Sequence, residues 1–566
     1  MAGLTVAAMG LAATRSVPLK MLPFDNKNEL LLVLDMDEGT TLERTNAVVQ
    51  EFEALVARTP EVTDYTSYVG LAGPIDFNGM VRHYYLRQKP HQAELRVNLA
   101  PKANRRLQSH AVGLRMRDEL TELARTHCAR LKLIELPPGP PVLSSVVAEV
   151  YGRPDQGYDE LIAASRTVAE RFRREPGVVD VDDTTEAPQQ KLVFVTDQEK
   201  AALARVTVAD VAETLRVALE GSSVETVRLE GERNPLRILL RLPRVLRSSG
   251  QDLSNVKVKG AGGQLVPLAE LGTWQTTRVD QTIYHKNLAR VMYVLGETAG
   301  RPPAECIVDM LADRAGQEEL RTAENDQVKI VGSGFVAVNE PRPVHQRSYF
   351  TNGSGVAWSV PDGVRVEFAG EGEWKITLDV FRDLGLAFGA ALLMIYVILV
   401  AQTGSFLVPV VVMLAIPLTV LGVMPGFYLL NALSAGSVGG YADPVYFTAT
   451  AMIGMIALAG IVTRDSIILV DFIGLAVRRG RPLFEAILES RVVRLRPILL
   501  TASAAMLSSI PITLDPIFSG LGWSLIFGLF ASTIFTLFVI PVTYWLITAP
   551  RSTDPERPVR IRQAAG

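Results

Sequence analysis

Apolar residues divide the chain into two parts with different patterns. Up to about residue 382 they recur at the short spacings of strands and amphipathic helices, and beyond it they form long runs. The runs cover residues 384–401, 406–430, 445–472, 498–512 and 522–547. Each reaches or approaches the roughly 20 residues that a bilayer requires. The fourth run is short, and its helix is expected to begin nearer residue 494. We therefore expect a membrane α+β protein whose bundle of five spanning helices occupies residues 377–549.

Residues 1–17 hold a further apolar run. It is too short to cross a bilayer, and it lacks the basic start of a signal peptide. We expect it to be the remnant of a truncated transmembrane helix.

In residues 18–141 the apolar positions follow the two-residue period of strands in some segments and the 3.6-residue period of helices in others. Strands are predicted at residues 29–37, after the proline of TPEV, at 93–99 and at 130–136, with helices after Thr41 and at 112–126. The order β-α-β-β-α-β is that of the split, ferredoxin-like motif. The stiff segment PPGPP ends this first repeat.

The same order starts again at residue 146, and REPGVVD at 174–180 stands where RTPEVTD stands in the first repeat. This second repeat is split into residues 142–190 and 280–376, with its third strand expected at 289–295. The insert, residues 191–279, is expected to be a small α+β domain with a helix at 208–219 and strands at 235–242 and 265–271. Residues 314–361 are expected to form an irregular loop.

Composition narrows the function classes. The 566 residues carry a net charge of −3, which gives no basic bias toward nucleic acid. The two cysteines and six histidines have no metal-ligand or redox spacing. The chain has no GxxxxGK[ST] loop for ATP and no nucleophile–base arrangement, so we expect neither an enzyme nor a metal site.

The arginines predict the topology. They cluster in residues 476–497 and in the tail, residues 550–566, whereas the connections 431–443 and 513–520 have neither lysine nor arginine. The positive-inside rule makes the arginine-rich segments cytoplasmic and residues 18–376 extracytoplasmic. In residues 481–491, Pro482 stands where the first residue of a helix would be. We therefore expect a helix that lies on the cytoplasmic face of the membrane; a solvated loop is the alternative.

Arg464 and Asp465 interrupt the apolar run at 445–472. A charge near the centre of a bilayer costs about 2.5–3.5 kcal/mol on insertion scales, so it usually marks an ion or proton pathway. The alternative is a helix that ends near Val462 and lets Arg464 reach the interface, but the apolar run resumes at residues 466–470. Asp465 is either a proton carrier or the counter-ion of Arg464.

A second polar stripe follows at Arg494, Thr501 and Ser508, which are seven residues apart and so share one helix face. Two polar stripes can face each other inside a bundle, although the hydroxyls could equally bond their own helix carbonyls. We predict a proton relay formed by Arg464, Asp465, Arg494 and Thr501.

Several segments together resemble the resistance-nodulation-division family of efflux permeases, specifically the C-terminal half of its drug-exporting, acriflavine-resistance-like branch. They are FDNKNEL at 24–30, PPGPPV at 137–142, GEGEWKIT before the first full span, GIVTRDSIILVDF around Arg464 and RLRPILLT at 494–501. The resemblance implies a proton-driven multidrug permease of the bacterial inner membrane. It makes the repeats periplasmic porter subdomains and the insert a docking subdomain.

In that family, protons pass between an acid pair in the N-terminal half and a lysine, an arginine and a threonine, which match Arg464, Arg494 and Thr501. Arg464 departs from the lysine because it keeps the charge but stays protonated, and Asp465 replaces an amide. The resemblance also implies no cofactor beyond the proton motive force. Its implied partners are the missing N-terminal half, a homotrimer, a periplasmic adaptor, an outer-membrane channel, membrane lipid and small amphiphilic substrates.

The resemblance places a loop that borders a substrate pocket at Phe77, Met80, His83 and Tyr85, for which ordinary strand and loop packing is the alternative. Two other functions stay open: a truncated or structural membrane-anchored fragment without transport, and a protein-translocation or lipid-export relative.

Overall fold

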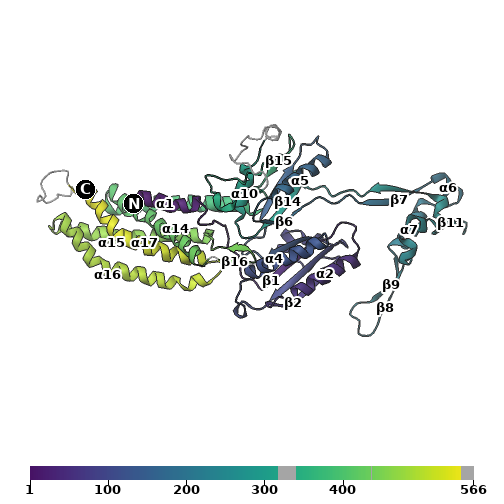
Figure 1. Ribbon diagram of the computed structural model, residues 1–566, viewed down its shortest axis with the longest axis horizontal. Coiled ribbons are helices and arrows are strands. Elements are labelled where there is room, and N and C mark those ends of the chain that lie inside the picture. The colour runs from purple at the N-terminus through teal and green to yellow at the C-terminus, as the bar shows by residue number, and fades with distance from the viewer. Residues whose placement is uncertain (316–339, 435, 550–566) are drawn as a thin grey trace. The chain divides into compact units, whose positions relative to one another are not determined.

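The computed structural model describes residues 1–315, 340–434 and 436–549. Its two compact units are Met1–Thr185 with Ile283–Gly566, and Glu186–Thr282 (Figure 1). The predicted tail and residues 316–339 of the predicted loop lie outside the described residues.

Five helices or helix pairs in the described part of the chain are long and apolar enough to cross a membrane, as the sequence predicts. They are α12 (Glu373–Thr403), α13 (Leu407–Met413) with α14 (Ala415–Ser434), α15 (Ala449–Arg478), α16 (Leu483–Ser509) and α17 (Ser519–Thr548). Helices α14, α15 and α17 pack together around buried Phe427, Leu458 and Leu529 (Figure 1). The short helix α1 (Ala2–Ala13) adds Ala8 to the same core.

Three predicted boundaries are wrong. Helix α12 starts at Glu373 because the polar residues ahead of the apolar run continue the same helix, and α15 likewise continues to Arg478. Helix α16 runs without a break from Leu483 through Pro497, so residues 481–491 form no separate surface helix. Ala486 and Ile487, in the first part of α16, are buried in the apolar core between the spanning helices. This packing explains why the helix continues.

The first repeat has the predicted element order. Its elements are β1 (Glu29–Asp35), α2 (Leu42–Val56), β2 (Val62–Val69), β3 (Gln92–Leu99), α4 (Ser109–Thr126) and β4 (Arg130–Glu135). The antiparallel sheet has the order β2-β3-β1-β4. The Thr41 side chain caps α2 by accepting from the Arg44 amide. Both helices cover one face of the sheet with apolar side chains such as Phe52 and Leu120.

The second repeat has the same topology. Its elements are β5 (Val146–Tyr151), α5 (Tyr158–Arg173), β6 (Val178–Asp183), β14 (Ala289–Thr298), α10 (Pro303–Ala312) and β15 (Arg365–Glu367). The order β6-β14-β5-β15 repeats that of the first sheet, and β13 (His285–Lys286) adds to β14. The three-residue strand β15 was not predicted, because three residues are too few to show an alternating pattern.

The unit Glu186–Thr282 starts and ends with an antiparallel pair, β7 (Gln190–Thr196) and β12 (Gly272–Arg278). The predicted helix is α7 (Val208–Leu219), which begins with a capping box of Thr207 and Asp210. A hairpin of β8 (Ser222–Val227) and β9 (Leu236–Leu240) follows. The strand expected at 265–271 stops at Pro267, where the short helix α9 (Leu268–Leu271) begins.

Candidate functional site

Arg464 and Asp465 lie at the midpoint of α15, which continues to Arg478, so a helix end near Val462 is excluded. Successive side chains on a helix point about 100° apart. Asp465 therefore points into the bundle and Arg464 away from it: their side chains are 9% and 54% exposed. The Arg464 Nε lies 3.6 Å from the Asp465 Oδ1, which is the one ionic contact of Asp465 among the described residues.

The hydroxyls beside Asp465 bond to their own helix. Thr463 Oγ1 donates to the Ala459 carbonyl at 2.8 Å, and Ser466 Oγ donates to the Val462 carbonyl at 3.2 Å. Both side chains are buried. Because these donors are already used, they leave the Asp465 carboxylate to Arg464 within the described bundle.

Arg494 reaches from α16 to α15. Its guanidinium carbon lies 5.1 Å from the centre of the Phe472 ring, a cation–π distance. Its Nε is buried and has no hydrogen-bond partner in the described part of the chain. The Arg494 charge is therefore held against an aromatic face rather than by a carboxylate.

Thr501 is exposed, and its hydroxyl reaches the Pro497 and Ile498 carbonyls, each at 3.1 Å. Ser508 similarly donates to Ala505. In this structure the hydroxyls of the α16 stripe bond their own helix. Of the four predicted relay residues, only Arg464 and Asp465 are in direct contact with each other.

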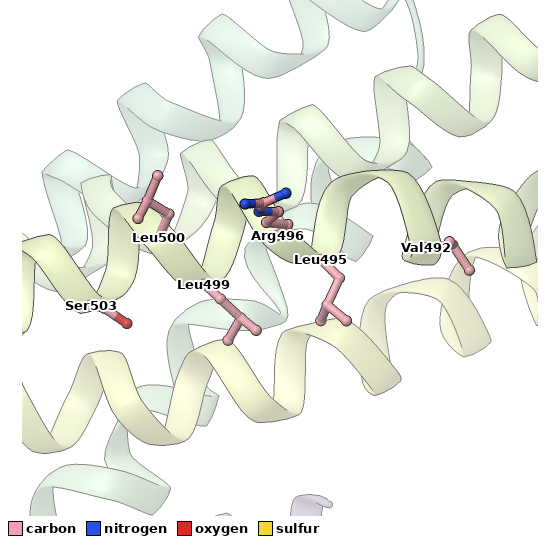
Figure 2. Close-up of a pocket in the computed structure, with 6 residues that line it drawn as sticks. All are labelled: Val492, Leu495, Arg496, Leu499, Leu500 and Ser503. Carbon is pink, nitrogen blue, oxygen red and sulfur yellow. The ribbon is translucent and has the colours of Figure 1, made fainter.

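A shallow groove of about 410 Å³ runs along α16. Figure 2 shows Leu495 and Leu499 projecting from the same side of the helix. The lining residues are Val492, Leu495, Arg496, Leu499, Leu500 and Ser503. At about 100° per residue, this face points away from Arg494 and Thr501, so the groove is separate from the relay residues.

The predicted substrate loop contains the short helix α3 (Phe77–Val81), which Asp76 caps through the Gly79 amide. Phe77 and Met80 are 62% and 49% exposed. His83 adopts a left-handed backbone with φ of 59°, and its ring meets the Tyr85 ring edge-on at 6.2 Å. The loop thus presents apolar side chains to its surroundings, and a pocket there stays a prediction.

The second repeat contains a buried group of charges that the sequence did not indicate, here called the arginine–carboxylate network. Arg15, which follows α1, binds Asp309 of α10 through two hydrogen bonds of 2.8 and 2.9 Å. Arg347 lies 2.7 Å from Glu175 and 2.9 Å from Asp309. The network consists of Arg15, Arg171, Arg301 and Arg347 with Glu175, Glu305, Asp309 and Asp313.

Burial alone would raise the pKa of Asp309, but the hydrogen bonds and charges of Arg15 and Arg301 hold it well below its usual range. The network has equal numbers of positive and negative groups, so its burial leaves little net charge. Arg15 and Asp309 are 294 residues apart in the sequence. No local pattern could have indicated this pair.

Comparison with known proteins gives relatives over most of the chain. The swarming motility protein SwrC of Bacillus subtilis is 25% identical over 72% of this chain and 33% of its own length. The multidrug resistance protein MdtC of Erwinia amylovora is 23% identical over 98% of this chain and 48% of its own length. The multidrug/solvent efflux pump membrane transporter MepB of Pseudomonas putida is 22% identical, with 96% and 46% covered.

The crystal structure of a heavy metal efflux pump has the same fold, with a TM-score of 0.70 and 20% identity over 96% of this chain and 49% of the pump. The chain spans about half the length, or less, of these relatives. Residues 1–320 and 354–548 match the profile of a single family. The chain belongs to the AcrB/AcrD/AcrF family.

Proposed function

We propose that the chain supplies the part of a proton-driven efflux permease that corresponds to the C-terminal half, and that the permease exports multiple drugs or other amphiphilic compounds. The observation that carries this proposal is the placement of Arg464 and Asp465 at the midpoint of α15. Such charges are costly inside a bilayer, so those that occur usually mark an ion or proton pathway. Family membership and relatives named as multidrug transporters support the substrate class.

In this proposal Asp465 is the group that binds and releases a proton, because Arg464 stays charged at any accessible pH. Arg494 supplies a second fixed charge, and Thr501 turns from its own helix to the relay when a partner approaches. An acid pair in an N-terminal half, on the same polypeptide or another, completes the charge balance that these arginines require.

The two repeats serve as periplasmic porter subdomains and residues 191–279 as a docking subdomain. The spanning helices form an inner-membrane bundle with a cytoplasmic C-terminus. Exposed Phe77 and Met80, with His83 and Tyr85, provide an apolar and aromatic surface for an amphiphile. The working assembly is a trimer that meets a periplasmic adaptor and an outer-membrane channel.

Arg464→Ala in the assembled permease tests the relay. The matched control is Arg478→Ala, because Arg478 is an exposed arginine at the end of the same helix. Efflux of a fluorescent amphiphile is followed in cells without other pumps, together with protein abundance. We expect export to fall to background in Arg464→Ala and to stay normal in the control.

Normal export by Arg464→Ala at normal abundance would refute the relay. No export by the wild-type assembly under a proton gradient would favour a structural, membrane-anchored role.

A further inference from the structure

Lys20 is fixed at the start of the helix that carries Arg464 and Asp465. Its backbone amide donates to the Phe447 carbonyl at 3.1 Å, and the Phe447 amide donates to the Pro18 carbonyl at 2.9 Å. Phe447 lies two residues before the first residue of α15. A shift at this end of α15 therefore moves Lys20.

The Lys20 side chain enters a cavity of about 70 Å³ and is itself buried. Its Nζ lies 3.2 Å from the centre of the Phe24 ring and 5.7 Å from that of Tyr446. Among the described residues, no carboxylate oxygen lies within 4.0 Å of the Lys20 Nζ, so Lys20 forms no ion pair with them. A cavity of this size has room for a few waters, which can carry protons to a buried amine.

Three glutamates line the same cavity, and each comes from a different element. Glu373 is the first residue of α12, and its backbone amide donates to the Ser145 carbonyl at 3.3 Å. Glu135 ends β4 of the first repeat, and Glu297 lies in β14 of the second. The cavity is thus the place where the first residue of α12 meets both sheets and the segment that holds Lys20.

Two of these glutamates already have partners. Glu135 accepts from His110 Nδ1 at 2.7 Å. Glu297 accepts from Arg82 at 2.9 Å and from Ser144 at 3.0 Å. Arg82 directly follows the helix that holds Phe77 and Met80, so the cavity also reaches the predicted substrate loop.

The other charged or titratable groups near Lys20 are also engaged. Arg117 lies 2.6 Å from Asp180, and Asp25 lies 2.8 Å from Lys27. Burial raises the pKa of the Tyr446 hydroxyl far above neutral pH. Lys20 and Glu373 are the two ionisable groups of the described cavity for which no side-chain hydrogen bond or ion pair is found.

Lys20 and Glu373 affect each other through their charges. Burial lowers the pKa of Lys20, and the charges of Glu373, Glu135 and Glu297 offset this only in part, with Glu373 having the largest effect of the three. Because the two groups share one cavity, a change of charge at Glu373 changes the electrostatic energy of Lys20.

We propose that Lys20 and Glu373 form a proton-sensitive latch between the membrane helices and the two repeats. While both are ionised, their attraction holds the first turn of α12 beside the start of α15. When Glu373 takes up a proton from the cavity water, its charge disappears, the attraction to Lys20 is lost, and the first turn of α12 is released. This inference goes beyond the proposed export function and can be tested without it.

Trp374 provides the readout because it follows Glu373 and packs against the core of the second repeat. The intrinsic fluorescence of the purified full chain is titrated with acid, and the signal of Trp374→Phe is subtracted. We expect a transition whose midpoint lies above the ordinary glutamate value of about 4.3. Glu373→Gln is expected to abolish it.

Lys20→Met gives a second test that leaves the glutamate in place. Removing the cation raises the pKa of Glu373, so the midpoint is expected to move up by about 1 pH unit. The matched controls are Lys27→Met and Glu371→Gln, since Lys27 is 49% and Glu371 45% exposed. Both controls are expected to keep the wild-type midpoint.

A wild-type signal without a transition, an unchanged transition in Glu373→Gln, or an unmoved midpoint in Lys20→Met would each overturn the latch. Loss of export in a chain that still shows the transition would count against the proposed function alone.

Discussion

The second repeat and the membrane helices differ in how many oppositely charged partners surround their charged side chains. In the arginine–carboxylate network, Arg347 has two carboxylate partners within 2.9 Å, and Asp309 is fully buried. In α15, Arg464 has one ion pair with a described residue, at 3.6 Å, and its side chain is half-exposed. Within the described residues, every member of the network has an oppositely charged partner, whereas Arg494 of the membrane helices has none.

The difference separates a structural role from a functional one. A buried ion pair holds its elements in place, and removing one partner is costly because the other charge is left buried and uncompensated. A charge that keeps few partners remains available to a proton or to a second membrane segment. Removing charged or hydroxyl groups from each region tests this contrast.

Asp309→Asn is expected to have the largest effect. It leaves Arg15, Arg301 and Arg347 with excess positive charge in a buried site, which should lower the free energy of unfolding by about 3–5 kcal/mol. Thermal and denaturant unfolding of the purified full chain measure it. Asp155→Asn is the control because Asp155 is 76% exposed, and an equal loss in both variants would contradict the assigned role of the network.

Acid is expected to weaken the second repeat through the same residue. The pKa of Asp309 is lower in the folded chain than in the unfolded one, so its stabilisation is complete above the ordinary value of about 3.9. It is lost as the pH falls from there toward the folded-state value. Melting temperatures between pH 6 and pH 3 should drop more steeply for the wild type than for Asp309→Asn, and parallel curves would contradict this.

Arg464→Met is expected to leave the chain at least as stable as the wild type, because it removes a charge that is costly inside a bilayer and breaks a single contact of 3.6 Å. Unfolding in a lipid bilayer or detergent measures this effect, with Arg478→Met as the control. A loss as large as that of Asp309→Asn would place Arg464 among the structural charges and remove the contrast.

Thr501→Val is expected to change the free energy of unfolding by no more than about 0.5 kcal/mol, because the exposed hydroxyl bonds only its own helix. Export should nevertheless fall if Thr501 belongs to the relay. Ser508→Ala, which removes a similar hydroxyl one stripe position further on, serves as the control. Equal export by both variants and the wild type would remove Thr501 from the relay.

The sequence predicts those parts of the fold that depend on local periodicity. Alternating and helical spacing place both repeats, and the long apolar runs place the five candidate spans. The boundaries of α12 and α16 were wrong because polar first turns and an internal proline resemble helix ends in sequence, while packing of Ala486 and Ile487 keeps α16 continuous.

The candidate site was predicted only where charges interrupt an apolar run, as Arg464 and Asp465 do. Lys20 and Glu373 come from distant segments and meet in one cavity. A single lysine in the segment PLKMLPF has no local signal of its own. Such pairings depend on the tertiary fold, so a single sequence does not reveal them.

The position of the inserted unit has a consequence for synthesis. The first sheet can close once Glu135 is made, because β4 completes it. The second sheet receives its central strand β14 only after the whole unit Glu186–Thr282 has left the ribosome, and β15 later still. Until β14 is made, the edges of β5 and β6 that pair with it remain without their hydrogen-bond partners. The two repeats share one topology, yet during translation one matures early and the other is exposed to mispairing for longer.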